Sequence, residues 1–380
     1  MIPYGRQNIS KNDIEAVTRV MRSDFLTQGP MVMEFEHSIV KKVDAKYAIA
    51  VNSATSALHL SCIALDLRPA DFLWTSPITF VASANCGVYC GAQIDFVDID
   101  PNTYNICTQK LEEKLIRAEK KDLIPKILVV VHFSGQSCDM KKIHALSKKF
   151  GFKVIEDASH AIGAKYRGDY VGGCKYSDIT VFSFHPVKII TSAEGGVLTT
   201  NDEEIALKAN CLRSHGGTKD KKTEGDWYYE QTELGFNYRM SDIHAALGRS
   251  QLTRLDSFVE ERSGLASSYD SMLKELPVNL PFVHEESYSS WHLYVIQLKM
   301  NKIKKTRKQI FDSMRAKGVG VHVHYIPVHT QPYYRNMGFS IGDFPIAEQF
   351  YQQALTIPMY PGLSDNDQRY VVKSLIESIG

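Results

Sequence analysis

A serine and a lysine five residues apart form the first pattern in this sequence that could support covalent chemistry. They begin and end the stretch Ser183-Phe184-His185-Pro186-Val187-Lys188, which lies between two apolar runs. A serine hydroxyl can bind a phosphate, and a lysine amine can react with an aldehyde. The pair therefore suits a compound that carries both groups, although a lysine in a loop between two strands can equally be a solvated cation.

Asp157 provides an acidic partner for Lys188. It follows the apolar pair Val154–Ile155 and is expected at the carboxyl end of a strand, where open α/β sheets bind ligands. A carboxylate that faces a pyridine nitrogen keeps that nitrogen protonated, so these residues together predict a site for pyridoxal phosphate. The alternative for Asp157 is a helix cap at the strand end. Strand alternation places the competing carboxylate, Glu156, on the opposite face.

The segment Asn52-Ser53-Ala54-Thr55-Ser56 is a candidate for binding the phosphate. It follows the apolar run 47–51 and is expected to connect a strand to the N-terminus of a helix. Free backbone N–H groups and the positive dipole end of a helix bind phosphate, and the hydroxyls of Thr55 and Ser183 would add donors. On this segment alone, an ordinary helix cap is the simpler interpretation.

Three ring-bearing side chains could contact the same cofactor. Phe80 could stack on the pyridine ring, His160 could bind its phenolic oxygen, and His185 could orient the lysine loop. Each has an alternative explanation in packing, because rings at such positions often belong to the core. No spacing of His or Cys residues resembles a metal site, so no metal is expected.

The elements that must position these residues alternate between strands and helices. Short apolar runs predict strands at residues 47–51, 72–74, 94–97, 127–131, 153–155, 179–182 and 197–199. Ser10-Lys11-Asn12-Asp13 is typical of a capped helix start, and helical segments separate most of the strands. This alternation predicts an α/β fold with a large, mostly parallel sheet covered on both faces.

The last third of the chain is expected to form a second unit. A long helix around residues 251–260 leads into it, and the pattern then predicts a strand at 291–298, a helix at 305–317, a second strand at 319–326 and two helices after Phe344 and Leu363. We therefore expect a large cofactor-binding domain over residues 1–255 and a smaller C-terminal α+β domain over residues 256–380. The N-terminal segment could pack with the smaller domain.

The composition excludes several classes of partner. Lysine and arginine number 44 against 43 aspartates and glutamates, a net charge of +1 that gives no basic surface for nucleic acid. No apolar run is long enough to cross a membrane, and the first residues lack the apolar core of a signal peptide. Seven cysteines without a Cys-x-x-Cys pair suggest free thiols. These features predict a cytoplasmic protein.

Eight ordered blocks of sequence carry a resemblance that covers nearly the whole chain. They are Leu26–Pro30, Asn52–His59, Ser76–Ala84, Asp98–Asp100 with Asn105, Glu156–Ala161, Ser183–Gly196, Arg213–Gly216 and Leu234–Ser241. In these blocks the chain resembles the sugar-nucleotide aminotransferases of the DegT/DnrJ/EryC1/StrS family. The resemblance implies the fold type I of pyridoxal phosphate-dependent transferases, which is the fold of aspartate aminotransferase.

The resemblance also implies a role for each matching residue. Lys188 would be joined to pyridoxal 5′-phosphate as a Schiff base, and Asp157 would be the second catalytic residue, facing the pyridine nitrogen. The other cofactor contacts would be Ala54, Thr55, Phe80, His160, Ser183 and Asn237. Asn237 would reach the cofactor of the other subunit, which implies a homodimer with shared active sites. Intact Lys188 argues against the dehydratases of the family, which have histidine there.

Within the family, the blocks most resemble the branch that acts in pseudaminic acid biosynthesis. This implies transfer of the amino group of L-glutamate to C4 of a UDP-linked 4-keto-6-deoxy-N-acetyl hexose, with ping-pong kinetics. The residues implied in substrate binding are Tyr4, Asp24, Phe25, Leu26, Thr27, Ala54, Ser183, His185, Asn237, Arg239, His324, Tyr325, Ile326 and Pro327.

Two alternatives to this function follow from the sequence. The first is a related aminotransferase that acts on another 4-keto sugar or on a 3-keto sugar, linked to dTDP, GDP or UDP. The second is a regulator that binds pyridoxal phosphate without turnover, which intact Lys188 and Asp157 disfavour. Position 160 is His where many members have Gln, and position 186 is Pro where Ala is common. These departures concern the subfamily more than the reaction.

Overall fold

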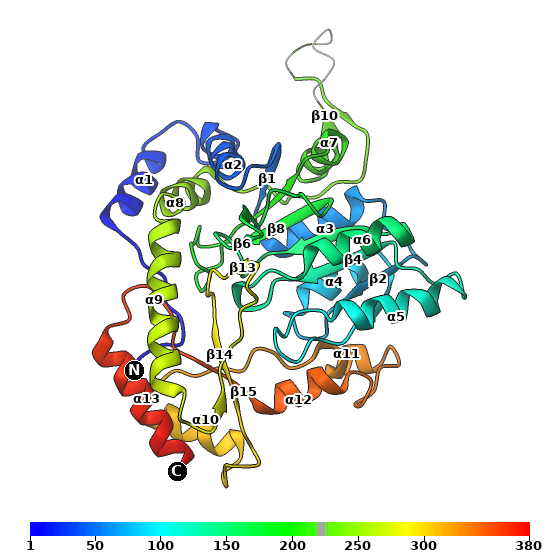
Figure 1. Cartoon of the computed structure of the whole chain (residues 1–380). Helices are drawn as coiled ribbons and strands as arrows, with labels where there is room; N and C mark the ends of the chain where they lie inside the picture. The colour runs from blue at the N-terminus through cyan, green and yellow to red at the C-terminus, as the bar shows by residue number, and fades with distance from the viewer. Residues whose placement is uncertain (219–224, 226) are drawn as a thin grey trace.

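A seven-stranded sheet forms the centre of the computed structural model, which describes residues 1–218, 225 and 227–380 (Figure 1). The strand order is β1-β9-β8-β5-β4-β2-β3, and β9 runs antiparallel to both neighbours whereas the other pairs are parallel. The strands are β1 (Tyr47–Val51), β2 (Phe72–Thr75), β3 (Gln93–Phe96), β4 (Ile127–Val131), β5 (Lys153–Asp157), β8 (Ile179–Ser183) and β9 (Gly196–Thr200). The expected α/β fold with a mostly parallel sheet is confirmed.

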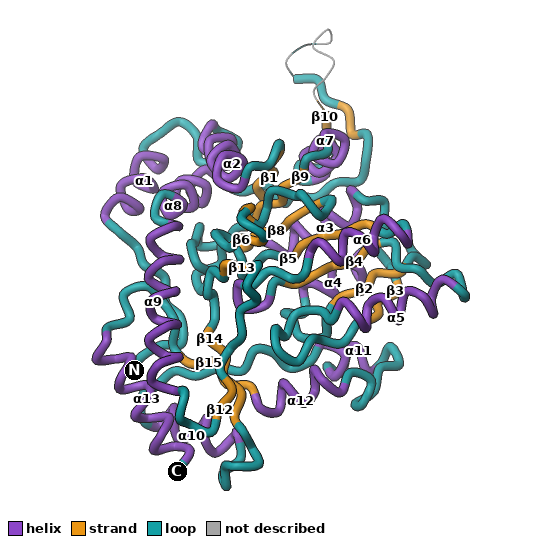
Figure 2. The backbone as a smooth tube through the Cα atoms, viewed as in Figure 1, coloured by secondary structure: helices purple, strands orange, loops and turns teal. Residues whose placement is uncertain are grey.

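Helices cover both faces of this sheet, because alternate side chains of each strand point to opposite sides (Figure 2). One face packs on α3 (Ala54–Ala64), α4 (Ala82–Tyr89) and α7 (Glu203–Leu212). The other packs on α2 (Pro30–Val43), α5 (Thr108–Glu119), α6 (Met140–Phe150) and α8 (Asp242–Leu252). In β4, for example, Ile127 and Val129 point to the face covered by α3, α4 and α7, whereas Leu128 and Val130 point to the opposite face.

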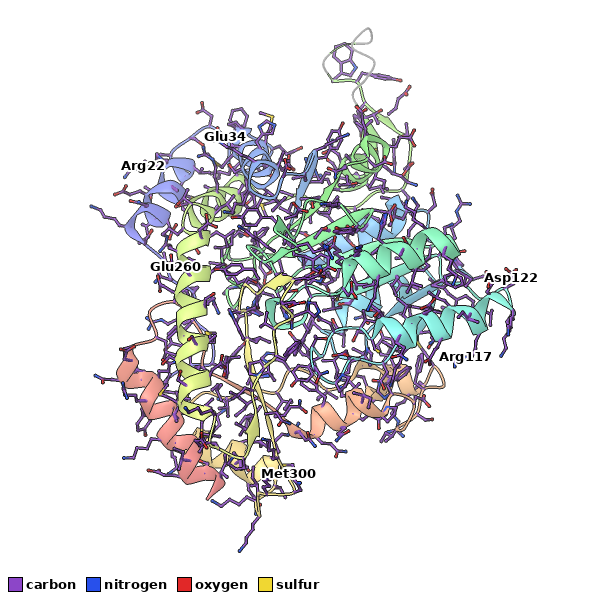
Figure 3. The ribbon with its side chains drawn as sticks, viewed as in Figure 1. Arg22, Glu34, Arg117, Asp122, Glu260 and Met300 are labelled. Carbon is purple, nitrogen blue, oxygen red and sulfur yellow. The ribbon has the colours of Figure 1, made fainter. Side chains whose placement is uncertain are left out.

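Helix α1 (Lys11–Met21) packs against α8 through a buried carboxylate. Ser10 and Asp13 form the expected capping box, and Asp13 also accepts hydrogen bonds from Ser250, Gln251 and Arg254 on or beside α8. Of the charged residues labelled in Figure 3, Arg22, Arg117, Asp122 and Glu260 are instead exposed on the outer surface. One buried acid thus fixes where this helix begins and where it docks.

Helix α9 (Leu255–Leu273) leads from the large sheet to the C-terminal elements, and the division into domains at residue 255 stays a prediction. A break at Thr253–Arg254 separates α9 from α8, where the sequence suggested one continuous helix. The antiparallel sheet β12-β14-β15 packs on α9, α10 and α13, and Ile2 packs against this core from the N-terminus. The bounds are β12 (Val278–Asn279), β14 (Tyr294–Leu298), β15 (Ala354–Ile357), α10 (Arg307–Ala316) and α13 (Asp365–Ile379).

The predicted strand at residues 319–326 is wrong. Within the described chain this segment makes only isolated bridges, from Val319 to Ile2 and from His322 to Thr356. Val319 and Val321 are buried, which explains the apolar pattern, but β14 pairs with β12 and β15, neither of which the sequence analysis identified.

Shorter elements complete the described chain. They are α11 (Pro332–Arg335), α12 (Pro345–Gln353), β6 (Lys165–Tyr166), β7 (Asp169–Tyr170), β10 (Gly217–Thr218), β11 (Glu230–Gln231), β13 (Ser287–Tyr288) and the 3₁₀ turns η1 (Phe133–Gly135) and η3 (Val328–Thr330). Among the described residues, no helix is both long and apolar enough to cross a membrane.

Candidate active site

A cavity of about 400 Å³ lies at the carboxyl ends of β4, β5 and β8, where Val131, Asp157 and Ser183 are the last strand residues. Its walls also come from the segment before α4, from the start of α3, from the loop after β8 and from residues 322–325. The cavity brings together these sequence-predicted residues: Tyr4, Ala54, Thr55, Phe80, Asp157, His160, Ser183, His185, Lys188, His324 and Tyr325.

Lys188 lies in the loop that returns from β8 to the antiparallel strand β9. Backbone hydrogen bonds from Phe184 to Gly195 (2.9 Å) and from Ser192 to Phe184 (2.9 Å) close the base of this loop. The side chain borders the cavity, and burial of its amine lowers the pKa of Lys188 to about 8, against a smaller opposing effect of the Asp157 charge. A much larger fraction of the amine is therefore neutral, and so nucleophilic, than in an ordinary lysine.

Asp157 ends β5 with its carboxylate facing the cavity and almost completely buried. Its Oδ1 accepts hydrogen bonds from the backbone N–H (3.1 Å) and hydroxyl (2.6 Å) of Ser159, and its Oδ2 accepts one from the hydroxyl of Ser83 (2.5 Å). Glu156 lies on the other face of the sheet, as strand alternation predicts, 2.6 Å from Nε2 of His132. Only Asp157 of the two acids lines the cavity.

The N-terminus of α3 forms one end of the cavity. Ser53 caps the helix by accepting a hydrogen bond from the backbone of Ser56 (3.1 Å), which leaves the first N–H groups of the helix, at Ala54 and Thr55, without helical partners. Gly196 approaches so closely that a Cβ at this position would lie 2.5 Å from the nitrogen of Ala54. A helix N-terminus with the hydroxyl of Ser183 on the same cavity wall suits a phosphate ester.

His160 and Tyr325 form a second wall. The backbone N–H of Ser134 donates to Nδ1 of His160 (3.3 Å), so the neutral ring carries its proton on Nε2, which lies 3.1 Å from the hydroxyl of Tyr325. Burial lowers the pKa of His160 well below its usual value and raises that of Tyr325. This wall therefore offers neutral hydrogen-bonding groups, while the ring of Phe80 lies 6.4 Å from that of Tyr325.

Further rings line the cavity beside Tyr4. The ring of Tyr4 lies 5.4 Å from that of His322 and 5.6 Å from that of His324, and burial lowers the pKa of His324 to about 3. The ring of His292 lies 4.4 Å from that of His160, in a tilted arrangement. The sequence analysis missed His292 and His322 as cavity residues. The strand-like period of His322 and His324 was visible in the sequence, whereas nothing distinguished His292 from a core residue.

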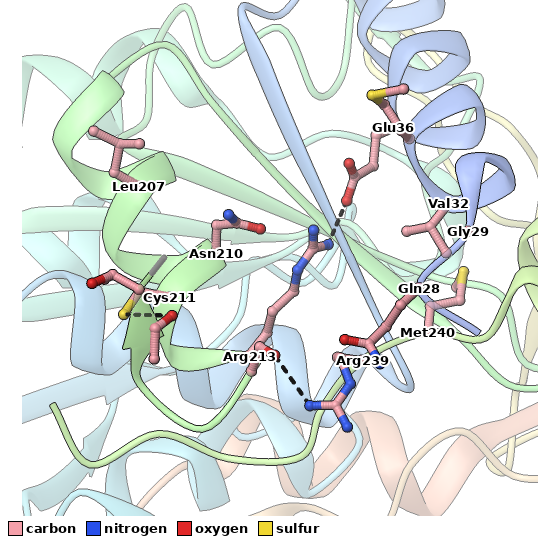
Figure 4. A pocket seen from close by; sticks show the side chains of 14 residues that line it. Gln28, Gly29, Val32, Glu36, Leu207, Asn210, Cys211, Arg213, Arg239 and Met240 are labelled. Carbon is pink, nitrogen blue, oxygen red and sulfur yellow. Dashed lines mark hydrogen bonds and ion pairs between the residues drawn. The ribbon is translucent and has the colours of Figure 1, made fainter. Parts of the chain in front are cut away.

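Several predicted substrate residues lie outside this cavity: Asp24, Phe25, Leu26, Thr27, Asn237, Arg239, Ile326 and Pro327. The segment 24–27 lies beside the segment 237–241, since Thr27 bridges Ser241 and the backbone of Asp242 donates to Leu26 (3.0 Å). Arg239 lines a different cavity, of about 560 Å³, where it donates to Ser214 (3.1 Å) (Figure 4). These two segments form one surface region on the monomer.

The donor set fits an organic cofactor better than a metal ion. Among the described residues, no group of three or more His, Cys, Asp or Glu side chains is placed to hold a metal. The cavity instead combines a nucleophilic amine, a buried carboxylate and a helix N-terminus, which match the aldehyde, pyridine nitrogen and phosphate of pyridoxal phosphate.

The model of the DegT/DnrJ/EryC1/StrS aminotransferase family matches residues 7–376. The chain belongs to this family. Aminotransferases of the family use pyridoxal phosphate, and the chain is accordingly a pyridoxal phosphate-dependent sugar aminotransferase that acts on an amino donor and a keto sugar.

Individual family members are similar to the chain over nearly its whole length. It is 39% identical to spore coat polysaccharide biosynthesis protein SpsC of Bacillus subtilis, covering 98% of this chain and 96% of that one. It is 38% identical to UDP-4-amino-4,6-dideoxy-N-acetyl-β-L-altrosamine transaminase of Campylobacter jejuni, covering 99% and 96%. The solved structure of Helicobacter pylori PseC, an aminotransferase of pseudaminic acid biosynthesis, superposes with a TM-score of 0.91 at 31% identity, covering 100% and 99%. The predicted fold type is confirmed.

Proposed function

We propose that this aminotransferase moves the amino group of L-glutamate to C4 of a UDP-linked 4-keto-6-deoxy-N-acetyl hexose, in the biosynthesis of pseudaminic acid. The observation that carries the proposal is a buried lysine amine of lowered pKa beside a buried carboxylate, in a chain that is similar over its full length to a transaminase of such a sugar. The PseC structure, with which this fold superposes closely, supports the same pathway.

The residues of the cavity divide the binding of pyridoxal phosphate among them. The N–H groups of Ala54 and Thr55 and the hydroxyl of Ser183 would hold its phosphate, and Asp157 would accept a hydrogen bond from its pyridine nitrogen. Phe80 is 59% exposed on the cavity wall, so its ring is available to cover one face of the cofactor. When bound, the cofactor supplies an aldehyde that accepts the amino group and a ring that withdraws electrons.

Lys188 would act twice in the reaction. Its Nζ would hold the aldehyde of the cofactor and, when free, would accept and return the proton at the substrate carbon. A pKa of about 8 favours this second role, because a general base works best when its pKa is close to the working pH. The neutral rings of His160 and Tyr325 would orient the bound groups without competing for that proton.

We also propose that the enzyme is a homodimer whose active sites are shared. Asn237 and Arg239 lie outside the cavity of their own subunit, beside segment 24–27, and so are available to a second copy. Large apolar side chains are exposed around them, including Leu234 (81%) and Leu207 (64%). Such a patch favours a protein partner, and an isologous interface would complete two equivalent sites.

A cytoplasmic location forms part of the proposal. All seven cysteines are free thiols in the structure, and several are buried. Free thiols are typical of a reducing compartment.

Two assays test the function. The first incubates the purified holoenzyme with L-glutamate alone and follows the visible absorption of the cofactor together with release of 2-oxoglutarate. One equivalent of each change per site is expected, and no change at all would indicate a binding protein without turnover. The second adds a panel of 4-keto and 3-keto nucleotide sugars, and the aminated product is identified by NMR.

The panel also tests the alternative substrate. The similarity to SpsC, whose name places it in spore coat polysaccharide biosynthesis, favours a related aminotransferase of another nucleotide sugar. Faster turnover of a 3-keto sugar, or of a sugar carried by dTDP or GDP, would select that alternative. It would leave the assignment of the cavity residues unchanged.

A further inference from the structure

Two buried hydroxyl groups form a hydrogen-bonded chain that ends on the carboxylate of Asp157. Oγ of Ser83 lies 2.5 Å from Oδ2 of Asp157, and Oγ1 of Thr79 lies 2.7 Å from Oγ of Ser83. Thr79 and Ser83 are both at most 2% exposed. Thr79 comes three residues before α4 and also lines the cavity, whereas Ser83 is the second residue of α4. The next residue after Thr79 is Phe80, so one short segment carries both this pair and the candidate stacking ring.

The direction of these hydrogen bonds follows from the number of hydrogens. An ionised carboxylate only accepts, so Ser83 must use its one hydroxyl hydrogen on Asp157. The bond between Thr79 and Ser83 then has Thr79 as its donor. The chain runs from Thr79 to Ser83 to Asp157, and it fixes the Ser83 hydroxyl in the orientation that stabilises negative charge on Oδ2.

The remaining acceptor positions of Asp157 leave room for one further donor. Among the described residues, Oδ1 receives both hydrogen bonds from Ser159, whereas Oδ2 receives one, from Ser83. A carboxylate has about four acceptor positions, two on each oxygen, so one position on Oδ2 stays available. Asp157 lines the cavity, and Ser83 is packed behind it.

We propose that Ser83 is a positioning residue of the reaction, which holds Asp157 as an oriented anion against the pyridine nitrogen, and that Thr79 sets the Ser83 hydroxyl for this purpose. The proposal rests on the proposed placement of Asp157. In that placement a single proton would be shared between the pyridine nitrogen and the Asp157 carboxylate, and hydrogen bonds to the charged carboxylate would favour the arrangement in which the nitrogen keeps it. Removing the Ser83 hydroxyl shifts that proton toward Asp157.

The test measures the protonation of the ring nitrogen directly. Apoprotein is reconstituted with pyridoxal phosphate labelled with ¹⁵N in the ring, and the ¹⁵N NMR shift reports whether that nitrogen is protonated. In Ser83→Ala, the nitrogen should move toward the unprotonated position and kcat should fall by about tenfold to a hundredfold, the equivalent of one hydrogen bond to a charged group. Ser83→Thr, which keeps the hydroxyl, should restore both values. Thr79→Val should move both in the same direction by less.

Ser61→Ala is the matched control. Ser61 is a fully buried serine on α3, and its hydroxyl donates to the backbone of Ala57 (2.7 Å), away from Asp157. This variant should lose stability without moving the ¹⁵N signal. A wild-type signal and rate in Ser83→Ala, or an equal shift in Ser61→Ala, would overturn the proposal. If Ser83→Ala does not fold, the comparison of Ser83→Thr with Thr79→Val decides in the same way.

The variant Asp157→Asn distinguishes a failure of this proposal from a failure of the proposed placement of Asp157 at the ring nitrogen. If Asp157→Asn itself leaves the ¹⁵N signal and the rate unchanged, the placement of Asp157 at the ring nitrogen is wrong. If Asp157→Asn changes both and the Ser83 and Thr79 variants change neither, only the positioning role of Ser83 is wrong.

Discussion

Replacing Lys188 with methionine should make the apoprotein more stable while abolishing its reaction. The folded protein lowers the pKa of this lysine from its ordinary 10.5 to about 8. At about 1.36 kcal/mol for each pH unit, burying the charged amine costs the folded state as much as about 3 kcal/mol. Methionine is similar in length and carries no charge, so Lys188→Met should recover most of that free energy at pH 7.

The sign of the pH dependence follows from proton binding. Below about pH 8 the lysine is protonated in the folded and unfolded states, and the full cost is present. Between about pH 8 and 10.5 the unfolded state binds more protons, so the wild-type protein regains stability as the pH rises. The advantage of Lys188→Met should therefore be largest at neutral pH and should disappear toward about pH 10.5.

Urea unfolding of the two apoproteins, followed by circular dichroism at one protein concentration and at about pH 7 and pH 10, measures this difference. Any gain from the apolar methionine side chain is independent of pH and cancels between the two conditions. Lys141→Met, on the exposed surface of α6, serves as the control and should show little change. An advantage of Lys188→Met that is equal at both pH values, or larger at high pH, would refute a buried amine of lowered pKa.

Three further outcomes are expected. Asp157→Asn keeps the shape of the side chain but removes its charge, so kcat should fall by at least about a hundredfold. A rate close to wild type in a steady-state assay would rule out the proposed role of the Asp157 charge. Gly196→Ala places a Cβ against the backbone nitrogen of Ala54 and should therefore weaken cofactor binding. Titration of the apoprotein with pyridoxal phosphate measures this affinity, and an unchanged affinity would argue against the proposed phosphate site. If the active sites are shared, mixing inactive Lys188→Ala and Asn237→Ala subunits should restore about a quarter of wild-type activity, because half of the dimers are mixed and each mixed dimer has one intact site. Confirmed subunit exchange without a return of activity would exclude shared sites.

The strands of the central sheet were predicted well because each one corresponds to a short apolar run in the sequence. Strands β1 and β4 have the bounds that the apolar runs indicated, and β5 and β8 extend them by one or two residues to Asp157 and Ser183. The alternation of side chains along β5 was enough to choose Asp157 over Glu156. In parallel strands buried on both faces, a continuous apolar run is itself the signature of the element.

The second unit was harder to predict because its pairing is not local. Val319 and Val321 have the alternation of a strand, but the pattern records only that they are buried, and burial here comes from contacts with Ile2 and neighbouring elements. For the same reason the sequence analysis assigned no role to Ser83, because its hydrogen-bond partner Asp157 is 74 residues away. In the sequence, a serine near the start of a helix that caps a turn cannot be distinguished from one that donates a hydrogen bond to a distant carboxylate.

The antiparallel pairing of β9 with β1 affects when the proposed phosphate site can be completed during synthesis. Gly196, at the start of β9, lies against the first residue of α3, and β9 pairs with β1 at the edge of the sheet. The two halves of the proposed phosphate site therefore come from segments that are far apart in the sequence. A ribosome-bound chain that ends before residue 200 has α3 and Asp157 but cannot pair β1 with a complete β9. Loading with pyridoxal phosphate should thus follow closure of the sheet, and a shortage of the cofactor should lead to accumulation of folded apoprotein rather than of nascent fragments.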